Sequence, residues 1–225
     1  MSVSAHDPCS PRLTIAVADE CPALREGLVR LIADECDLEA IDSAATPTEL
    51  KAMVLRRAPQ VVVMDLMLGE TDGLALIKEL GVLAPDVRVV VFTLEPEDVY
   101  ALRAFRAGAR AFISKRDAVS SLFRAAREVA AGGLVVPAIV SSLMFADAAP
   151  VRRAGDGIDA QLTDRELQVF RLVGLPLPTR VIAERLGVSV KTVETHRENI
   201  KNKLALNTHQ ELLACASTWL RERCS

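Results

Sequence analysis

The stretch Val61–Gly73 reads VVVMDLMLGETDG. Its first four residues are apolar and three of them are β-branched, which is typical of a short strand buried on both faces of a parallel sheet. This run ends at Asp65, and the glycines and acidic residues that follow indicate a loop. Ligands of open α/β sheets bind beyond the carboxyl ends of the strands, so Asp65 is a candidate functional residue.

The same alternation of strand and helix patterns extends in both directions from this stretch. Short β-branched runs predict strands at Leu13–Ala18, Leu38–Asp42, Val61–Met64, Val87–Phe92 and Ala111–Ile113. Amphipathic segments between them predict helices near Pro22–Asp34, Thr48–Arg57, Gly73–Gly81, Pro96–Ala107 and Ala118–Ala131. Five strands that alternate with five helices predict an α/β fold in which helices cover both faces of a parallel sheet.

Polar residues follow four of the five predicted strands at their carboxyl ends. They are Asp19 and Glu20, Asp65, Thr93 and Lys115. Three carboxylates in one place repel one another unless a hard cation joins them, and Mg²⁺ prefers such oxygen ligands. Each residue also has a plainer interpretation, as a turn residue, a helix cap or a solvated charge. Their joint placement favours a site in which Asp65 attacks a phosphoryl group, Lys115 neutralises charge and Thr93 donates to a phosphate oxygen.

Four motifs in this region resemble the receiver domain of bacterial response regulators. They are ADECPALREGL at 18–28, VVVMDLMLGETDG at 61–73, VFT at 91–93 and AFISK at 111–115. The resemblance implies a flavodoxin-like, doubly wound five-stranded parallel sheet with strand order 2-1-3-4-5. It also implies that a sensor histidine kinase phosphorylates Asp65, that Thr93 and Lys115 sense the phosphate, and that Mg²⁺ is the cofactor. The metal ligands would be Asp19, Glu20, Asp65 and the backbone carbonyl of Met67.

Other positions either match or depart from the receiver pattern. Phe112 matches an aromatic residue that changes rotamer on activation, although a half-buried strand aromatic is an equal alternative. Leu68-Gly69 stands where the family often has Met-Pro, so we expect a more flexible loop.

The C-terminal part of the chain has a helical pattern throughout. Thr163 and Glu166 have capping-box spacing, a first helix is expected at about Thr179–Leu186, Gly187 ends it, and Ser189 begins another. The segments LTDRELQVFRLV at 162–173 and RVIAERLGVSVKTVETHRENIKNKL at 180–204 resemble the LuxR/NarL-type helix-turn-helix. The resemblance implies an all-α domain whose second helix enters the major groove of promoter DNA.

A helical wheel of 191–204 separates an inner stripe from an outer face. Val193, Ile200 and Leu204 form the inner stripe. Arg197 lies at the border of that stripe. The candidate DNA-binding residues come from the outer face, its flanks and the basic residues Arg197 and Lys203; they are Lys191, Thr192, Glu194, Thr195, Arg197, Glu198, Lys201, Asn202 and Lys203. A merely solvated helix face is the alternative, and the matching first helix and glycine turn favour DNA binding.

Three further features concern the C-terminal domain and its charge. Ala205 replaces the glycine that is usual after the second helix. Leu212, Leu213, Ala216 and Leu220 form a stripe that would serve either dimerisation or core packing. Residues 156–225 hold 10 Lys/Arg against 9 Asp/Glu, so bulk charge gives little support for DNA binding.

We expect a disordered tail at 1–12, a receiver domain at 13–132, a linker with room for a short helix at 133–160, and a helix-turn-helix domain at 161–225. The chain has no apolar run long enough to cross a bilayer and no signal-peptide pattern, which predicts a cytoplasmic protein that does not act on membranes. The five scattered cysteines predict reduced thiols rather than a zinc site.

The sequence therefore predicts a two-component response regulator that binds DNA, with no enzymatic activity beyond receiver-type autophosphorylation and autodephosphorylation. Its expected partners are a sensor histidine kinase, promoter DNA and a second copy of the chain, and RNA polymerase is a further candidate. One alternative keeps the DNA binding but uses the receiver as a phosphate-independent interaction module. A phosphatase with an aspartyl nucleophile fits less well, because that class needs a second Asp where this chain has Met67.

Overall fold

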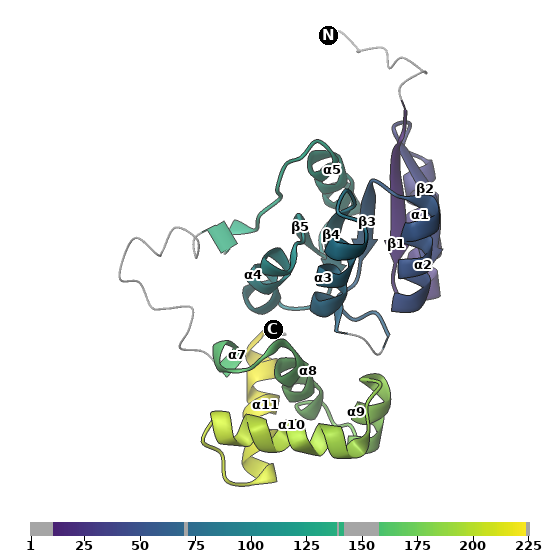
Figure 1. The fold of residues 1–225 in the computed structure, drawn as a ribbon. Coiled ribbons are helices and arrows are strands. Elements are labelled where there is room, and N and C mark those ends of the chain that lie inside the picture. Colours follow the sequence, from purple (N-terminus) through teal and green to yellow (C-terminus); the bar gives the residue numbers. More distant parts are fainter. Residues whose placement is uncertain (1–10, 70–71, 139, 142–157, 224–225) are drawn as a thin grey trace.

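The computed structural model describes residues 11–69, 72–138, 140–141 and 158–223, which form two domains (Figure 1). The N-terminal domain contains five strands, β1 (Leu13–Ala18), β2 (Leu38–Ala44), β3 (Val61–Met64), β4 (Arg88–Thr93) and β5 (Ala111–Ser114). They form one parallel sheet in the order β2-β1-β3-β4-β5. The predicted sheet and strand order are confirmed, and the strand boundaries differ from prediction by at most two residues.

Helices cover both faces of this sheet, as predicted. The helices are α1 (Pro22–Ala33), α2 (Pro47–Arg57), α3 (Gly73–Leu83), α4 (Glu97–Ala107) and α5 (Val119–Ala130). One apolar cluster joins the sheet to α1 and α5, and a second joins it to α2, α3 and α4. The second cluster continues without a break into the C-terminal domain. The two domains are therefore packed against each other.

The C-terminal domain is all helical. Its elements are α7 (Ile158–Gln161), α8 (Asp164–Val173), α9 (Thr179–Arg185), α10 (Val190–Lys203) and α11 (His209–Arg223). The predicted capping box at Thr163 and Glu166 is present at the start of α8, and Ser189 caps α10. Gly187 has φ +60° in the tight turn between α9 and α10. These are the features of a helix-turn-helix.

The core of this domain contains most of the apolar residues expected there. Val193 and Ile200 of α10 are fully buried, and the rings of Phe170 and Trp219 meet edge to face with their centroids 5.7 Å apart. Of the predicted α11 stripe, Leu212, Ala216 and Leu220 are buried in this core, whereas Leu213 is 41% exposed. Core packing is thus the use of three of these four residues.

Some sequence predictions concern residues that lie outside the described ranges. The predicted linker at 146–157 and most of the short helix expected at 134–145 are among them, although Ala138, Val140 and Ser141 are helical. Most of the predicted N-terminal tail also lies there. Cys21, Cys36 and Cys215 are free thiols. In the described ranges, no helix is both long and apolar enough to cross a membrane.

The end of α10 carries backbone strain at a single exposed residue. Ala205 has φ +53°, and the N–H of Leu206 donates to the carbonyl of Lys201 at 2.9 Å, a Schellman-type ending. Glycine adopts this left-handed conformation at no steric cost, whereas alanine does not. We expect Ala205→Gly to stabilise the C-terminal domain by about 0.5–1 kcal/mol.

Urea unfolding followed by the fluorescence of Trp219, the only tryptophan, measures this change in the domain that contains it. The matched control is Ala214→Gly, at an exposed position inside α11, which is expected to destabilise the same domain by about 1 kcal/mol. Equal destabilisation by both variants would show that Ala205 is not strained.

Candidate functional site

The register of the sheet brings the predicted acidic residues to one edge. Ala18 at the end of β1 pairs with Met64 at the end of β3, so Asp19 and Asp65 both begin loops at the same point. Both are buried, with 3% and 8% of their surface exposed. Thr93 pairs with Ser114 at the ends of β4 and β5, which places Lys115 directly beyond the same edge. Four residues far apart in sequence therefore meet.

Lys115 joins the two buried carboxylates. Its Nζ lies 2.5 Å from Oδ2 of Asp19 and 2.5 Å from Oδ2 of Asp65. Burial lowers the pKa of Lys115, but the hydrogen bonds and charges of the two aspartates outweigh this and raise the pKa above its usual range. The lysine is therefore held as a cation between two anions.

The second oxygen of Asp65 accepts two further hydrogen bonds. The hydroxyl of Thr93 donates to Oδ1 at 2.6 Å, and the backbone N–H of Met67 donates to the same atom at 3.2 Å. Thr93 does not cap α4, since Pro96 occupies the N-cap position and has no side-chain hydrogen bond. Its hydroxyl instead lies against the proposed acceptor, fully buried.

The donor set at this edge suits a hard cation in its chemistry, because it consists of two buried carboxylates that already share the charge of Lys115. Glu20 is exposed and is not drawn into the group. Among the described residues, no three His, Cys, Asp or Glu side chains are gathered closely enough to bind a metal. A metal would therefore be held by Asp19 and Asp65 first, and Glu20 would join only by turning inward.

Two other residues lie near the site: Phe112, which was predicted from the sequence, and Glu95, which was not. Phe112 is 2% exposed and belongs to the apolar cluster beneath α3 and α4, so it faces inward. Glu95 was not predicted, although it is an acidic residue only two positions after Thr93. Its side chain is 2% exposed and lies 2.7 Å from a guanidinium nitrogen of Arg171 in α8.

Burial raises the pKa of Glu95 to about 7, against the lowering effect of Arg171 and with a smaller contribution from the charge of Asp65. The carboxylate is therefore an anion above neutral pH, with Arg171 as its counter-ion.

The outer face of α10 is open to solvent. Lys191, Thr195, Glu198 and Asn202 are exposed, as the helical wheel predicts, while Val193 and Ile200 are buried. In Figure 1, α8 lies between α10 and the N-terminal domain, and α10 runs along the far side. The predicted groove-facing surface is thus accessible while the two domains are in contact.

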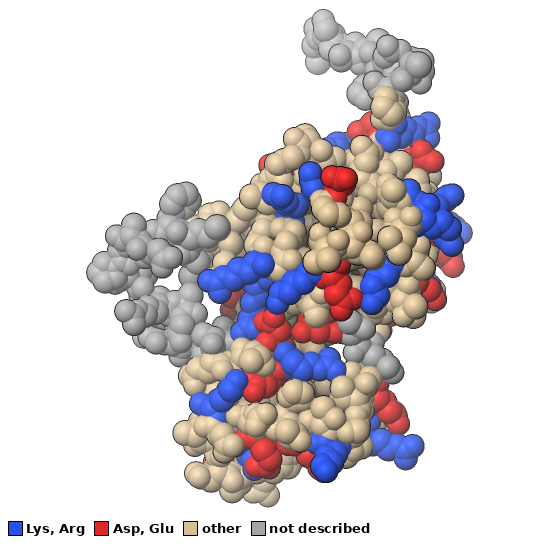
Figure 2. Space-filling view, in the orientation of Figure 1, with Lys and Arg blue, Asp and Glu red and all other residues tan. Residues whose placement is uncertain are grey.

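Most of the predicted cations of α10 have partners within the domain. Arg197 donates to the hydroxyl of Thr179 at 2.7 Å, and burial lowers its pKa. Lys203 lies 2.6 Å from Glu166, and Lys201 lies 2.9 Å from Glu198. Figure 2 shows acidic and basic side chains interspersed over the visible face, with no single basic patch. Lys191 is exposed, and none of the described residues forms an ion pair with it, so of these four cations it is the best placed for a phosphate contact.

Family models match both domains. Residues 15–127 match the response regulator receiver domain, and residues 160–216 match the bacterial regulatory proteins of the luxR family. Together these matches account for nearly all of the residues that the structure places in regular elements.

Curated relatives and solved structures agree with these matches. The chain is 30% identical over 202 residues to the transcriptional activator protein ExaE of Pseudomonas putida, which covers 90% of this chain and 94% of that protein. It is 30% identical over 213 residues to the oxygen regulatory protein NreC of Staphylococcus carnosus, at 91% and 96% coverage. RcsB of Salmonella enterica serovar Typhimurium has the same fold, with a TM-score of 0.65, 20% identity and coverage of 92% of this chain and 99% of that chain.

The fold and the aspartate-lysine-threonine cluster, with the attached helix-turn-helix, define a receiver domain joined to a LuxR-type domain. The chain belongs to the NarL/FixJ family of two-component response regulators, whose members are DNA-binding transcription regulators rather than enzymes.

Proposed function

We propose that a sensor histidine kinase phosphorylates this regulator on Asp65 in the presence of Mg²⁺, and that phosphorylation promotes dimerisation and binding to promoter DNA. The observation that carries the proposal is the convergence of Lys115 and Thr93 on the two oxygens of a buried Asp65. The relative RcsB has been solved bound to a promoter in the presence of the phosphomimetic BeF₃⁻, which supports the same link between a phosphoryl group and DNA.

The residues of this chain have separable roles in the transfer. An oxygen of Asp65 forms a bond to phosphorus as the bond between phosphorus and its donor breaks. The ammonium of Lys115 neutralises negative charge on the transferred group, and the hydroxyl of Thr93 donates to one of its oxygens. Asp19, Glu20, Asp65 and the carbonyl of Met67 would hold Mg²⁺, which supplies further charge neutralisation. Receiver-type autophosphorylation from a small donor and autodephosphorylation follow from the same arrangement.

We further propose that promoter DNA is bound through the outer face of α10 and that the protein acts in the cytoplasm. The contacts would come from the residues that the helical wheel indicates, with Lys191 as the main phosphate contact and the polar side chains of Thr195 and Asn202 facing base edges. RNA polymerase is a candidate partner.

The proposed domain boundaries are 13–132 for the receiver, 133–160 for the linker and 161–225 for the DNA-binding domain, and the two family matches support them.

Labelling with a radioactive small phosphodonor such as acetyl phosphate tests the acceptor assignment. We expect the wild type to be labelled with Mg²⁺ and not with EDTA. We expect Asp65→Asn to abolish labelling because, among the described residues, Asp65 is the buried carboxylate that both Lys115 and Thr93 contact. The matched control is Asp117→Asn, which removes an exposed carboxylate just after β5 and should be labelled like the wild type. Persistent labelling of Asp65→Asn would rule out Asp65 as the acceptor, whereas absence of labelling of the wild type would favour the phosphate-independent alternative.

A further inference from the structure

A buried ion pair, whose acidic partner lies two residues after Thr93, is one of the contacts between the two domains. Glu95 lies in the turn between β4 and α4, and Arg171 comes from α8 of the DNA-binding domain. Their charged groups are 2.7 Å apart, and the side chains are 2% and 25% exposed. Loss of either partner strongly destabilises the contact between the domains, because the remaining charge is left buried without a counter-ion.

This ion pair is connected to Asp65 through Thr93. The hydroxyl of Thr93 donates to Oδ1 of Asp65 and accepts a hydrogen bond from the backbone N–H of Glu95 at 3.3 Å. A continuous set of polar contacts therefore runs from Asp65 through Thr93 and Glu95 to Arg171. It passes from the acceptor to the DNA-binding domain over only three contacts.

We propose that Glu95 and Arg171 are the link by which phosphorylation of Asp65 releases the DNA-binding domain from the receiver. This inference rests on the proposed phosphorylation. When a phosphoryl group is attached to Asp65, the hydroxyl of Thr93 turns to a phosphate oxygen. The N–H of Glu95 then loses its acceptor, and the turn that holds its carboxylate against Arg171 rearranges. The ion pair is lost and α8 separates from the receiver.

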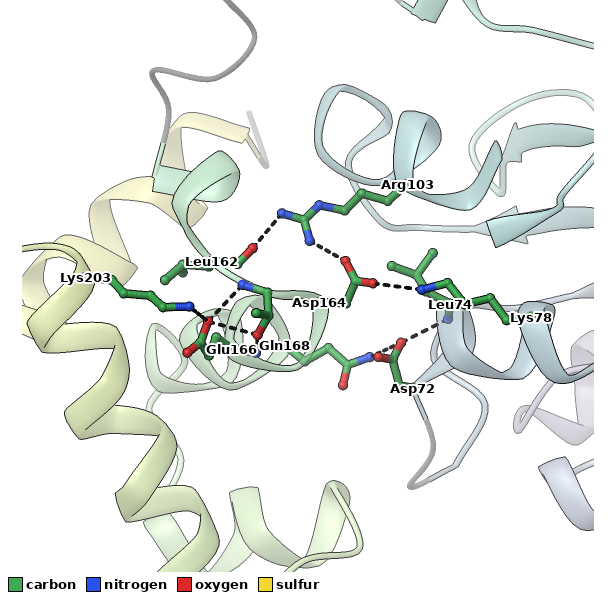
Figure 3. A network of polar contacts seen from close by, with 10 residues as sticks. Asp72, Leu74, Lys78, Arg103, Leu162, Asp164, Glu166, Gln168 and Lys203 are labelled. Atoms are coloured by element: carbon green, nitrogen blue, oxygen red, sulfur yellow. Dashed lines mark hydrogen bonds and ion pairs between the residues drawn. The ribbon is translucent and has the colours of Figure 1, made fainter. Parts of the chain in front are cut away.

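The rest of the interface is held by contacts that do not pass through Thr93 (Figure 3). Arg103 of α4 forms an ion pair with Asp164 and donates to the carbonyl of Leu162 at 2.9 Å. Lys78 lies 3.7 Å from Asp164, and the amide of Gln168 donates to Asp72 at 3.1 Å. These contacts stabilise the arrangement in which the two domains are docked, which we call closed. Among the interdomain contacts of the described residues, the Glu95–Arg171 pair is the one connected to Asp65 through Thr93. Asp164→Asn is therefore a matched control that weakens the interface without cutting the link.

What the closed arrangement restrains is the position of the DNA-binding domain, not access to its α10 face. The outer side chains of α10 are already exposed while α8 is docked. Release of α8 thus gives the domain freedom to take the arrangement that a second copy of the chain requires on DNA.

Tyr100 provides a native reporter of opening because it is the only tyrosine in the chain. It lies in α4, is 1% exposed, and its phenol is close enough to Glu95, Arg171 and Arg103 for their charges to act on its pKa. The experiment records NMR spectra of the full chain with ring-¹³C-tyrosine, with and without acetyl phosphate and Mg²⁺. The pH is about 8, above the pKa of Glu95, so that this carboxylate is ionised. Hydrogen exchange of residues 164–173 and labelling of Asp65 are measured on the same samples.

We expect the wild type to be closed without the donor and to open with it. Glu95→Gln and Arg171→Gln should each lower the closed-to-open ratio at least about tenfold without the donor, and the double variant should change it by no more than about twofold beyond either single variant. Both variants should still be labelled, yet respond to the donor less than about twofold. Asp164→Asn should be partly open and keep the full response to the donor.

Four results would overturn the inference. Variants at Glu95 or Arg171 that stay closed and open normally on phosphorylation would show that the ion pair is not the link. Loss of the response in Asp164→Asn as well would show that any weakening of the interface suffices. Labelling of the wild type without opening would overturn this inference alone, whereas absence of labelling would overturn the proposed phosphorylation and this inference with it.

Discussion

Replacement of Lys115 by Met is expected to lower the free energy of unfolding of the receiver domain by about 3 kcal/mol in EDTA. The lysine side chain is 12% exposed and is the cation between Asp19 and Asp65, so its removal leaves two buried carboxylates facing each other. Mg²⁺ should restore more stability to the variant than it adds to the wild type, because the cation takes over the charge compensation. Urea unfolding followed by circular dichroism, with EDTA or Mg²⁺, measures both effects.

The pH dependence of this stability has a defined sign. Because the pKa of Lys115 is raised in the folded protein, its contribution is fully present below the ordinary lysine pKa and is lost as the pH rises through the folded value. The wild type should therefore lose stability in the alkaline range where Lys115→Met does not. The control is Lys51→Met, whose ion pair with Glu79 is exposed and worth less than about 1 kcal/mol. If Lys115→Met were as stable as the wild type in EDTA, Lys115 would not have the assigned role of neutralising the two carboxylates.

Replacement of Lys191 by Glu is expected to weaken DNA binding about tenfold or more at low salt. Lys191 is exposed near the start of α10, where a helix in the major groove lies close to the phosphate backbone. The loss of one phosphate contact should also reduce the slope of log affinity against log salt concentration by about 1. Fluorescence anisotropy with a labelled DNA duplex at several salt concentrations gives both values.

A matched charge change elsewhere separates this contact from a change in net charge. Lys51→Glu alters the net charge equally but lies in α2 of the receiver. It should leave the salt slope unchanged, and an equal loss of affinity in both variants would mean that Lys191 makes no specific contact.

Much of the fold could be predicted from sequence because its signals are local. The apolar run before Asp65 defines a strand by its composition alone, and the capping box at Thr163 and Glu166 is visible as a spacing of three residues. The convergence of Asp19, Asp65 and Lys115 follows from a general property of parallel sheets, whose strands all end at one edge.

Features that depend on three-dimensional neighbours could not be predicted in the same way. A helical wheel places Arg197 at the border of the inner stripe of α10. It does not show that Thr179 of another helix accepts a hydrogen bond from Arg197. The exposure of Glu20 likewise depends on the loop conformation and not on its place after β1. The pairing of Glu95 with Arg171 depends on how two domains dock, and no periodicity within either domain encodes that contact.

Genome-wide mapping of DNA occupancy, in cells that carry either the wild-type chain or Asp65→Asn, tests most directly whether phosphorylation of Asp65 controls DNA binding. We expect the wild type to occupy a set of promoters under conditions in which it is phosphorylated, and we expect Asp65→Asn to lose most of that occupancy at equal protein levels. Equal occupancy of the same promoters by both proteins would contradict control of DNA binding through Asp65.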